Sequence, residues 1–461
     1  MLLLAIRKEI VHNVLSFRFQ ATYALLFGLV LMAVFLMASD YGRRSQEATT
    51  EETKARAAID EIARIDDPTK QFQEFQRFTL QGVRRPRPLS VLARGLEGIL
   101  PTQVSAQSFW LQSSDDRLGR NMLLRIFQAP DYAYVVNIVM SLLALLFVFD
   151  AVCGEKERGT LKILLANAVP RDTVLLAKWI GGYVSIAVPF SVASLGGFAY
   201  VYLTGAVEVD GDLVRRALLI FAVSLLYVSA FFTLGLMIST FTQRAATSLL
   251  VCLLVWIGWI LVVPNTAPIV ARLAAPVPDR QVIDAEKQAI DRETQLLSEA
   301  IGKRKVYGDA AEGERLRQDA ETRKSTLERF YRDRMQRQVS LSKNLARVSP
   351  SASYLLAATR LAGTGTDLFD HFEKALEKFR QGQQEYQRRV FSSSAVTFTR
   401  AGIQMSDPDW FKPEDLPRFT MFAESVGEAL DGAFTDILLL AVYNVLFFML
   451  AFVRFLRYDV T

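Results

Sequence analysis

The residues best placed for chemistry lie in one short charged stretch, at positions 153–173. The sequence Glu-Lys-Glu-Arg occupies positions 155–158, directly after a long apolar run, and Gly159 and Thr160 follow it. Interleaved carboxylates and cations suit ionic docking to another protein. Catalysis would need a convergent Ser/His/Asp set or paired carboxylates, and the sequence shows neither. We therefore predict a binding segment and not an enzyme.

Metal, disulfide and nucleotide chemistry are not predicted either. The chain holds only two His and two Cys, far apart in the sequence, so neither a metal-ligand cluster nor a disulfide framework is indicated. No G-x-x-x-x-G-K-[ST] phosphate loop occurs; Gly302-Lys303-Arg304 lacks the upstream glycine. We expect no cofactor bound by this chain. The net charge of +5 is typical of a membrane protein with basic cytoplasmic flanks, so no nucleic-acid partner is expected.

Six long apolar runs must position this charged stretch. Hydrophobic residues make up 51% of the 461 residues and charged residues 22%, and the two kinds are segregated along the chain. A membrane-spanning helix needs about 20 mostly apolar residues. The runs that qualify cover residues 16–39, 132–152, 174–203, 213–241, 245–263 and 434–455. The sequence therefore predicts a multi-pass protein in the lipid bilayer.

The distribution of Lys and Arg predicts that both termini are cytoplasmic. Basic residues flank the spans on one side, around positions 7–18, 156–178, 244 and 454–457. In the short turn 204–212, by contrast, all charged residues are acidic. Short cytoplasmic loops carry the excess of positive charge. Arg215 and Arg216 count against this orientation.

Residues 1–15 are apolar except around positions 7–9. This pattern predicts an amphipathic helix on the membrane surface, and the alternative is a simple extension of the first span.

Two large extracytoplasmic regions remain, at residues 40–131 and 264–432. In the second, helix-forming residues fill positions 279–303 and 314–347 around a turn at 306–313, which predicts a helical hairpin. A further helix is expected at 368–390. The hairpin is charged on most faces, so a solvated stalk and a partner-binding surface both stay open.

The charged stretch itself predicts a compact element held at the membrane face. Gly154 permits a break, Thr160 can cap a short amphipathic helix over 161–167, and Pro170 ends that helix before the third span. Such an element is tied to two spans and could transmit force to them. An ordinary cytoplasmic loop of mixed charge is the alternative.

A family resemblance favours the first interpretation. Gly154-Glu155-Lys156-Glu157, Gly159-Thr160-Leu161, Pro170-Arg171 and Lys178 together resemble the motif after the second span of ABC-2 type transporter permeases. Segments 87–92, 347–351, 361–365, 416–419 and 455–460 are similar to a subgroup with large extracytoplasmic insertions, which includes gliding-motility-type permeases.

The resemblance implies a coupling helix at 153–173 that contacts a separate ABC ATPase subunit, which would bind the ATP. The residues expected to carry this role are Glu155, Glu157, Arg158, Gly159, Thr160, Leu161, Leu164 and Arg171. In this interpretation the Glu side chains pair with basic groups on the ATPase, and Leu161 and Leu164 fill a groove. No substrate-binding residue is identified.

The expected fold is an all-α polytopic membrane protein, with six transmembrane helices and two large, mainly helical extracytoplasmic insertions. The expected function is ATP-driven translocation, with export favoured, across the bacterial cytoplasmic (inner) membrane. Six spans imply a second permease copy, either identical or similar. The alternative is a mechanotransmitting subunit whose hairpin drives an extracytoplasmic protein partner without passing a substrate.

Overall fold

The computed structural model describes residues 2–105, 131–162, 170–304, 309–392, 396–399 and 402–458. Its contacts divide the chain into two compact units. The first unit comprises Met1–Leu253 and Tyr354–Thr461, and the second comprises Leu254–Ser353. Regular structure in the described residues is almost entirely helical, which confirms the all-α prediction.

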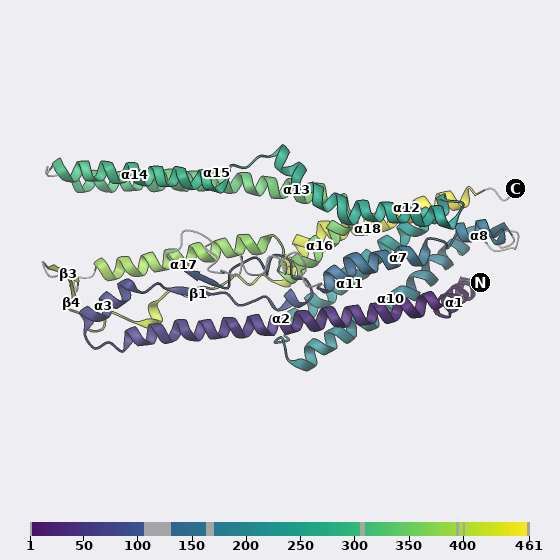
Figure 1. Cartoon of the computed structure of the whole chain (residues 1–461), viewed down its shortest axis with the longest axis horizontal. Coiled ribbons are helices and arrows are strands. Elements are labelled where there is room, and N and C mark those ends of the chain that lie inside the picture. Colours follow the sequence, from purple (N-terminus) through teal and green to yellow (C-terminus); the bar gives the residue numbers. More distant parts are fainter. Residues whose placement is uncertain are drawn as a thin grey trace. The chain divides into compact units, whose positions relative to one another are not determined.

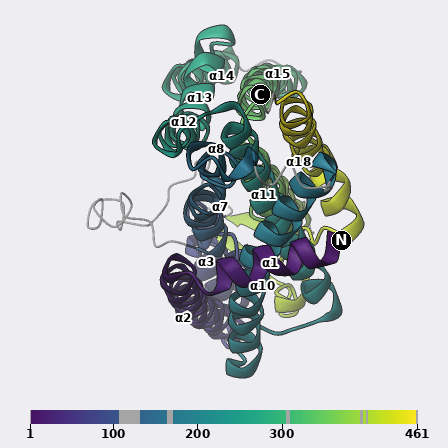
Figure 2. The ribbon, with the colours of Figure 1, turned by 90° about the vertical axis from the view of Figure 1, so that its right-hand side faces the viewer.

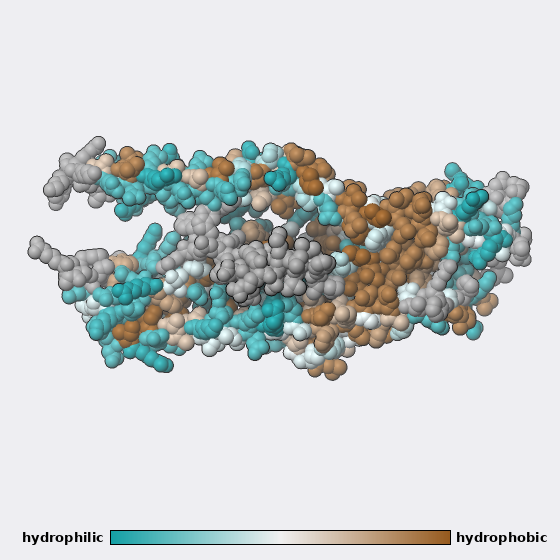
Figure 3. All heavy atoms as spheres, viewed as in Figure 1, coloured by the Kyte–Doolittle hydropathy of each residue, from teal (hydrophilic) through white to brown (hydrophobic). Residues whose placement is uncertain are grey.

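Six helices in the described residues are long and apolar enough to cross a membrane. They cover Thr22–Ala63, Tyr132–Glu157, Arg171–Thr204, Gly211–Phe241, Ala245–Ala274 and Val426–Leu456. In the first unit, hydrophobic residues gather where α7, α10, α11 and α18 lie, and hydrophilic residues surround the end near α8 (Figure 3). The chain is therefore a polytopic membrane protein.

Helix α11 (Gly211–Phe241) is the most buried span of the first unit. It packs against α7 (Ser141–Val148) and α18 (Val426–Leu456), and also contacts α10 (Arg171–Thr204). A Cβ atom at Gly235 would lie 2.4 Å from Val148 Cγ1. Only glycine permits this close approach of α11 to α7, as small residues commonly do between membrane helices.

Helix α1 (Leu2–Val14) is a separate element and does not simply extend the first span. The long helix α2 (Phe17–Ala63) begins after Ser16, whose hydroxyl accepts a hydrogen bond from Phe19 N at 3.2 Å. Seen from the end that carries α8, α1 crosses in front of α10 (Figure 2). Gly181 of α10 allows this crossing, since a Cβ there would lie 2.8 Å from Glu9 Cβ. Placement of α1 in the membrane surface stays a prediction.

The rest of the first unit forms a layer at the end of the spans opposite α8 (Figure 1). Helix α2 continues into it without a break. The other elements are α3 (Pro68–Arg77), β1 (Gln81–Val83), η1 (Pro88–Val91), β2 (Gln103–Ser105), α16 (Pro350–Ala362), α17 (Asp367–Ser392), β3 (Val396–Thr399), β4 (Gly402–Met405) and η4 (Pro413–Asp415). An aromatic cluster that includes Phe75, Phe379, Tyr386 and Phe411 forms its core. Two short antiparallel hairpins, β1–β2 and β3–β4, were not expected from the sequence.

The second span, which includes α7, and the fifth span both contain π-helical turns. Helix α6 (Tyr132–Tyr134) leads through η2 (Val135–Met140) into α7, and α12 (Ala245–Ile257) leads through η3 (Gly258–Val262) into α13 (Val263–Ala274). In the first of these spans, Tyr227 from α11 donates to Asn137 O at 2.8 Å, within the η2 turn. A neighbouring helix thus supplies a donor where the helical pattern changes.

The second unit contains the predicted helical hairpin. Helices α14 (Arg280–Arg304) and α15 (Asp309–Ala346) pack along each other, and Lys324 pairs with Asp291 at 2.5 Å. The second helix begins at Asp309, which corrects the expected turn over 306–313. Ala310, Ala311 and Glu312 favour helix strongly enough to carry it through Gly313, whose cost is about 1 kcal/mol.

Candidate functional site

The predicted coupling segment begins where the second span ends. After α7 the chain turns into α8 (Cys153–Glu157), reverses at Gly159 and becomes helical again at residues 160–162. Gly159 has φ of +72°, a left-handed conformation that glycine adopts without strain. Leu164 and the rest of the expected helix over 161–167 lie outside the described residues.

Two serines fix the entrance to α8. Ser239 Oγ of α11 accepts hydrogen bonds from Val152 N at 3.0 Å and Cys153 N at 3.1 Å. Ser248 Oγ of α12 donates to Phe149 O at 2.7 Å. These bonds satisfy buried backbone groups at the point where the helical pattern of the second span is interrupted. These hydrogen bonds therefore connect the start of α8 to both α11 and α12.

Lys156 binds the end of α11. Its Nζ donates to Thr240 O at 2.5 Å and Thr242 O at 3.1 Å, and it lies 5.1 Å from the centre of the Tyr458 ring. The last carbonyl groups of a helix lack partners within the helix and carry partial negative charge, so a cation is favourable there. Lys156 thus connects the segment to the fourth span.

Glu157 binds the beginning of α12. Its Oε2 accepts a hydrogen bond from Ala245 N at 2.9 Å. An acidic side chain at a helix N-terminus satisfies an unpaired N–H and interacts favourably with the helix dipole. Glu157 thus connects the segment to the fifth span.

Arg171 binds the end of α18 in the way that Lys156 binds the end of α11. Its Nη1 donates to Leu456 O at 2.8 Å and to Tyr458 O at 2.9 Å. Arg171 is the first residue of α10. One guanidinium therefore joins the start of the third span to the end of the sixth.

Lys178 connects the segment to the N-terminal helix. Its Nζ lies 2.6 Å from Glu155 Oε1 and 3.2 Å from Glu9 Oε1, and the residue is 7% exposed. A buried ammonium group is stable only when its charge is paired. This Glu9–Lys178–Glu155 triad therefore joins α1, α10 and α8.

The predicted residues divide into two sets in the structure. Arg158, Gly159 and Thr160 are exposed, as is Glu157, and Arg158 Nε donates to Gly154 O at 3.0 Å within its own turn. Glu155, Glu157 and Arg171 bind groups of their own chain, as described above. Leu161 is fully buried within the chain, so its side chain is not available to a groove on another protein.

Five residues that complete this arrangement were not among the predicted site residues: Glu9, Lys156, Lys178, Ser239 and Ser248. Lys178 gave the clearest signal, because a lysine inside an apolar span needs a partner. Lys156 belongs to the charged cluster at 155–158, but that cluster does not indicate its partners on α11. Glu9, Ser239 and Ser248 gave no signal, since an isolated charge or hydroxyl near a span end is usually solvated.

The chain matches the model of the ABC-2 family transporter protein over residues 3–460. It is also similar to "Probable ABC transporter permease protein NosY" of Stutzerimonas stutzeri, with 38% identity over 79 residues, which are 17% of this chain and 27% of that protein. The protein of the same name from Pseudomonas aeruginosa is 32% identical over 83 residues, 18% of this chain and 30% of its own length. The alignments with these curated relatives thus span less than a third of either one. Because the family model covers nearly the whole sequence, the chain belongs to the ABC-2 family of transporter proteins.

Proposed function

We propose that this chain is the permease subunit of an ABC transporter and that it couples ATP hydrolysis by a separate ATPase subunit to export of a substrate. The observation that carries the proposal is the attachment of the segment at 153–173 to four other parts of the first unit. Lys156, Glu157, Arg171 and the Lys178 triad reach α11, α12, α18 and α1. A displacement of this segment would act on all of these helices together.

Within this proposal the two sets of residues have different tasks. The exposed tip formed by Arg158, Gly159 and Thr160 contacts the ATPase. Glu155, Glu157 and Arg171, together with Lys156 and Lys178, position that tip on the spans. This assignment differs from direct pairing of both Glu side chains with the ATPase, because each already has a partner in its own chain.

The proposed topology places the tip and both termini in the cytoplasm and the chain in the bacterial inner membrane. The basic flanks around α8 and α10 support this orientation. The two arginines that oppose it are engaged within the chain: Arg215 pairs with Asp212 at 2.7 Å, and Arg216 Nη1 donates to Leu361 O at 3.1 Å. Their charge therefore need not mark a cytoplasmic flank.

The proposed assembly contains the ATPase, which binds the ATP, and a second permease copy that completes the translocation path. This chain would itself hold no cofactor and perform no hydrolysis. The mechanotransmitting alternative is not proposed, because no observation in the described residues favours it.

The proposal is tested by the Arg158→Glu variant of the full chain, purified with its ATPase and reconstituted in lipid. Charge reversal at the exposed tip is expected to lower permease-stimulated ATP hydrolysis about tenfold, since a charge-assisted contact contributes ~1.5 kcal/mol. The thermal stability of the permease should be unchanged. Arg77→Glu, an exposed arginine of α3 with one exposed partner, is the matched control. Full stimulation and assembly with Arg158→Glu would contradict the assignment.

A further inference from the structure

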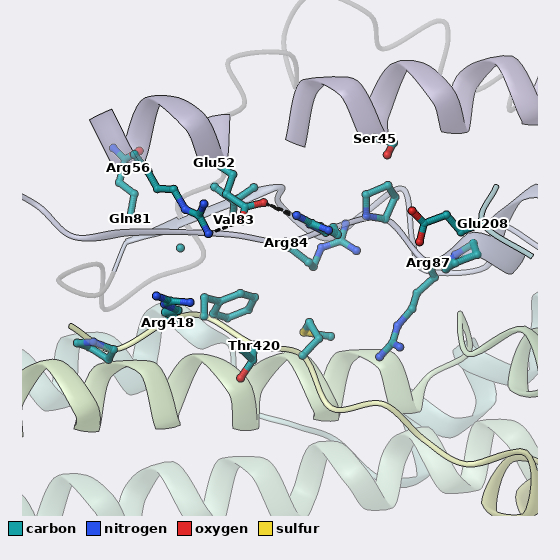
Figure 4. A pocket seen from close by; sticks show the side chains of 18 of the residues that line it. Ser45, Glu52, Arg56, Gln81, Val83, Arg84, Arg87, Glu208, Arg418 and Thr420 are labelled. Carbon is teal, nitrogen blue, oxygen red and sulfur yellow. Dashed lines mark hydrogen bonds and ion pairs between the residues drawn. The ribbon is translucent and has the colours of Figure 1, made fainter. Parts of the chain in front are cut away.

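A large cavity lies in the first unit, in the layer opposite α8. Its volume is about 1250 Å³. Four stretches form its walls: residues 41–60 of α2, the extended segment 80–88, the turn 205–210 and the extended segment 413–421. In Figure 4 the segment with Gln81, Val83 and Arg84 faces the segment with Arg418 and Thr420 across this space. None of the contacts of the proposed coupling site involves these walls.

One wall is a strand edge without a neighbouring strand among the described residues. Strand β1 pairs antiparallel with β2, with Gly82 opposite Val104 and Val83 opposite Gln103. Arg84 N donates to Thr102 O at 2.8 Å, so residues 82 and 84 face β2. Main-chain groups alternate along a strand, so the N–H and C=O groups of Gln81 and Val83 point to the other edge.

Such an edge is a site to which an extended peptide can add as a further strand. The sheet that contains β1 has two strands in the described part of the chain. Gln81 and Val83 are both lining residues of the cavity. The unpaired edge of β1 thus lies at the wall of the cavity.

Arg56 and Arg418 supply positive charge at this cavity. Arg418 is exposed, and it makes no ion pair or hydrogen bond with the described residues. Arg56 has one long ion pair, to Glu52 at 3.8 Å. Arg84, by contrast, is buried and paired with Glu97 at 2.6 Å. Arg56 and Arg418 are therefore the two lining guanidinium groups best able to bind a carboxylate.

The other lining charges argue against a polyanion. The walls carry five arginines, and they also carry five carboxylates: Glu52, Asp60, Glu208, Asp210 and Glu414. In Figure 4 Glu208 lies toward the opposite side of the cavity from Arg56 and Arg418. A nucleic acid or a polyphosphate would meet these carboxylates. A peptide with a single carboxylate brings far less negative charge to these walls.

We propose that this cavity binds an extended peptide segment of an extracytoplasmic partner protein, which adds as a strand to the free edge of β1 and places a carboxylate near Arg56 and Arg418. Main-chain hydrogen bonds to Gln81 and Val83 supply register, and the arginines select an acidic side chain. Peptide binding at this site is separate from the proposed coupling role and does not involve the ATPase. It locates a surface for a partner outside the spans.

The test uses the full chain in lipid nanodiscs and a fluorescent synthetic peptide, Thr-Val-Glu-Val-Thr, capped at both ends. Two matched peptides serve as controls. One carries Lys in place of Glu, and the other carries N-methyl groups on the two valines. Binding is measured by fluorescence anisotropy. The Glu peptide should bind at least tenfold more tightly than either matched peptide, because each lacks one of the two proposed sets of contacts.

Two variants locate the binding. Arg418→Glu should weaken the Glu peptide about tenfold and should favour the Lys peptide, whereas Lys412→Glu makes the same charge change outside the cavity lining and should have no effect. Val83→Pro removes the N–H group that points away from β2, while the N–H groups of Gly82 and Arg84 that face β2 remain, and it should also abolish binding. No saturable binding below about 1 mM, equal binding of the three peptides, or unchanged binding by Arg418→Glu would overturn the proposal.

These outcomes are independent of the coupling assignment, because ATP hydrolysis is not part of the measurement. Stimulated hydrolysis that is lost in Arg158→Glu can coexist with failure of the peptide to bind, and the reverse is equally distinguishable.

Discussion

The two ends of the spans in the first unit use charged side chains in different ways. At the end with α8, Lys156, Glu157 and Arg171 bind main-chain groups at the termini of other helices. At the opposite end, the central contact is an ion pair with both members buried, whereas in the Lys178 triad near α8 only the lysine is buried and both carboxylates are partly exposed. Arg84 and Glu97 form an ion pair whose side chains are 4% and 0% exposed.

This difference separates a movable attachment from a fixed frame. A side chain that binds the end of a helix can follow the helix when it moves as a unit. A buried ion pair resists displacement, because separating its members leaves uncompensated charge in a medium of low polarity. Arg84 also donates to Leu100 O at 3.2 Å, and Glu97 also accepts from Arg87 N at 3.2 Å. We therefore expect the opposite end to control stability and the α8 end to control function.

The largest effect should come from Glu97→Ala. Removal of this carboxylate leaves the Arg84 guanidinium buried without its charge partner, which should cost about 3–5 kcal/mol of unfolding free energy. Thermal unfolding of the purified protein in detergent measures the loss. The matched control is Glu52→Ala, whose partner Arg85 is exposed, and which should cost less than about 1 kcal/mol. Equal losses in the two variants would remove the distinction between a fixed and a solvated pair.

Lys178→Met should have a smaller effect on stability and a large effect on function. The variant separates α8 from α1 and leaves Glu9 and Glu155 close together, but both carboxylates are partly solvated. We expect a loss of about 2 kcal/mol in unfolding free energy and strongly reduced stimulation of the ATPase.

A double-mutant cycle with Glu155→Gln gives a control for this variant. The coupling free energy between the two positions should be about 1 kcal/mol or more, because the side chains are in contact. Purely additive losses, or normal ATPase stimulation by Lys178→Met, would show that the triad does not position the tip.

The smallest effect concerns Asp131, at the end of the spans opposite α8. Its carboxylate accepts hydrogen bonds from Arg94 N and Tyr134 N, both at 2.7 Å, while burial raises its pKa above the usual 3.8. A raised pKa in the folded state means that folding favours the protonated form. The contribution to stability is thus full below the unfolded pKa and is lost as pH rises through the folded pKa.

Asp131→Asn removes the titration and keeps one acceptor oxygen, so it retains one of these two hydrogen bonds and loses the other at every pH. Its stability relative to the wild type should increase as pH rises above 3.8 toward neutrality. Unfolding measured across this acidic range checks the sign. A relative stability that falls with rising pH would show that the backbone hydrogen bonds outweigh the burial of the charge.

The sequence predicted the spans well because each apolar run is sufficient on its own to indicate a membrane helix. It did not predict that α2 continues unbroken to Ala63. Residues 40–63 are polar but rich in Ala, Glu and Arg, and such residues form a helix readily when it is already nucleated by the preceding span. The strands β1 and β2 were missed because each has only three residues, too few for a periodic pattern.

The charge pattern and the family resemblance predicted a coupling role for the segment at 153–173, which stays a prediction, but they did not predict the contacts of this segment within the chain. Glu157 bonds to a residue 88 positions away, and Arg171 to one 285 positions away. No local pattern identifies such partners. When these partners are not known, Glu155 and Glu157 look like free acidic groups available to another protein. In the folded chain, Glu155 pairs with Lys178 and Glu157 accepts a hydrogen bond from Ala245 N.

The most direct test of the central claim is photo-crosslinking from the exposed tip. A photoreactive amino acid at Thr160 of the full chain, produced together with its ATPase, should give an adduct with the ATPase subunit that changes in yield when nucleotide binds. The same group at Thr204, which is exposed at the opposite end of α10, should give none. An ATPase adduct from position 204, or none from position 160 in an assembled complex, would contradict the account.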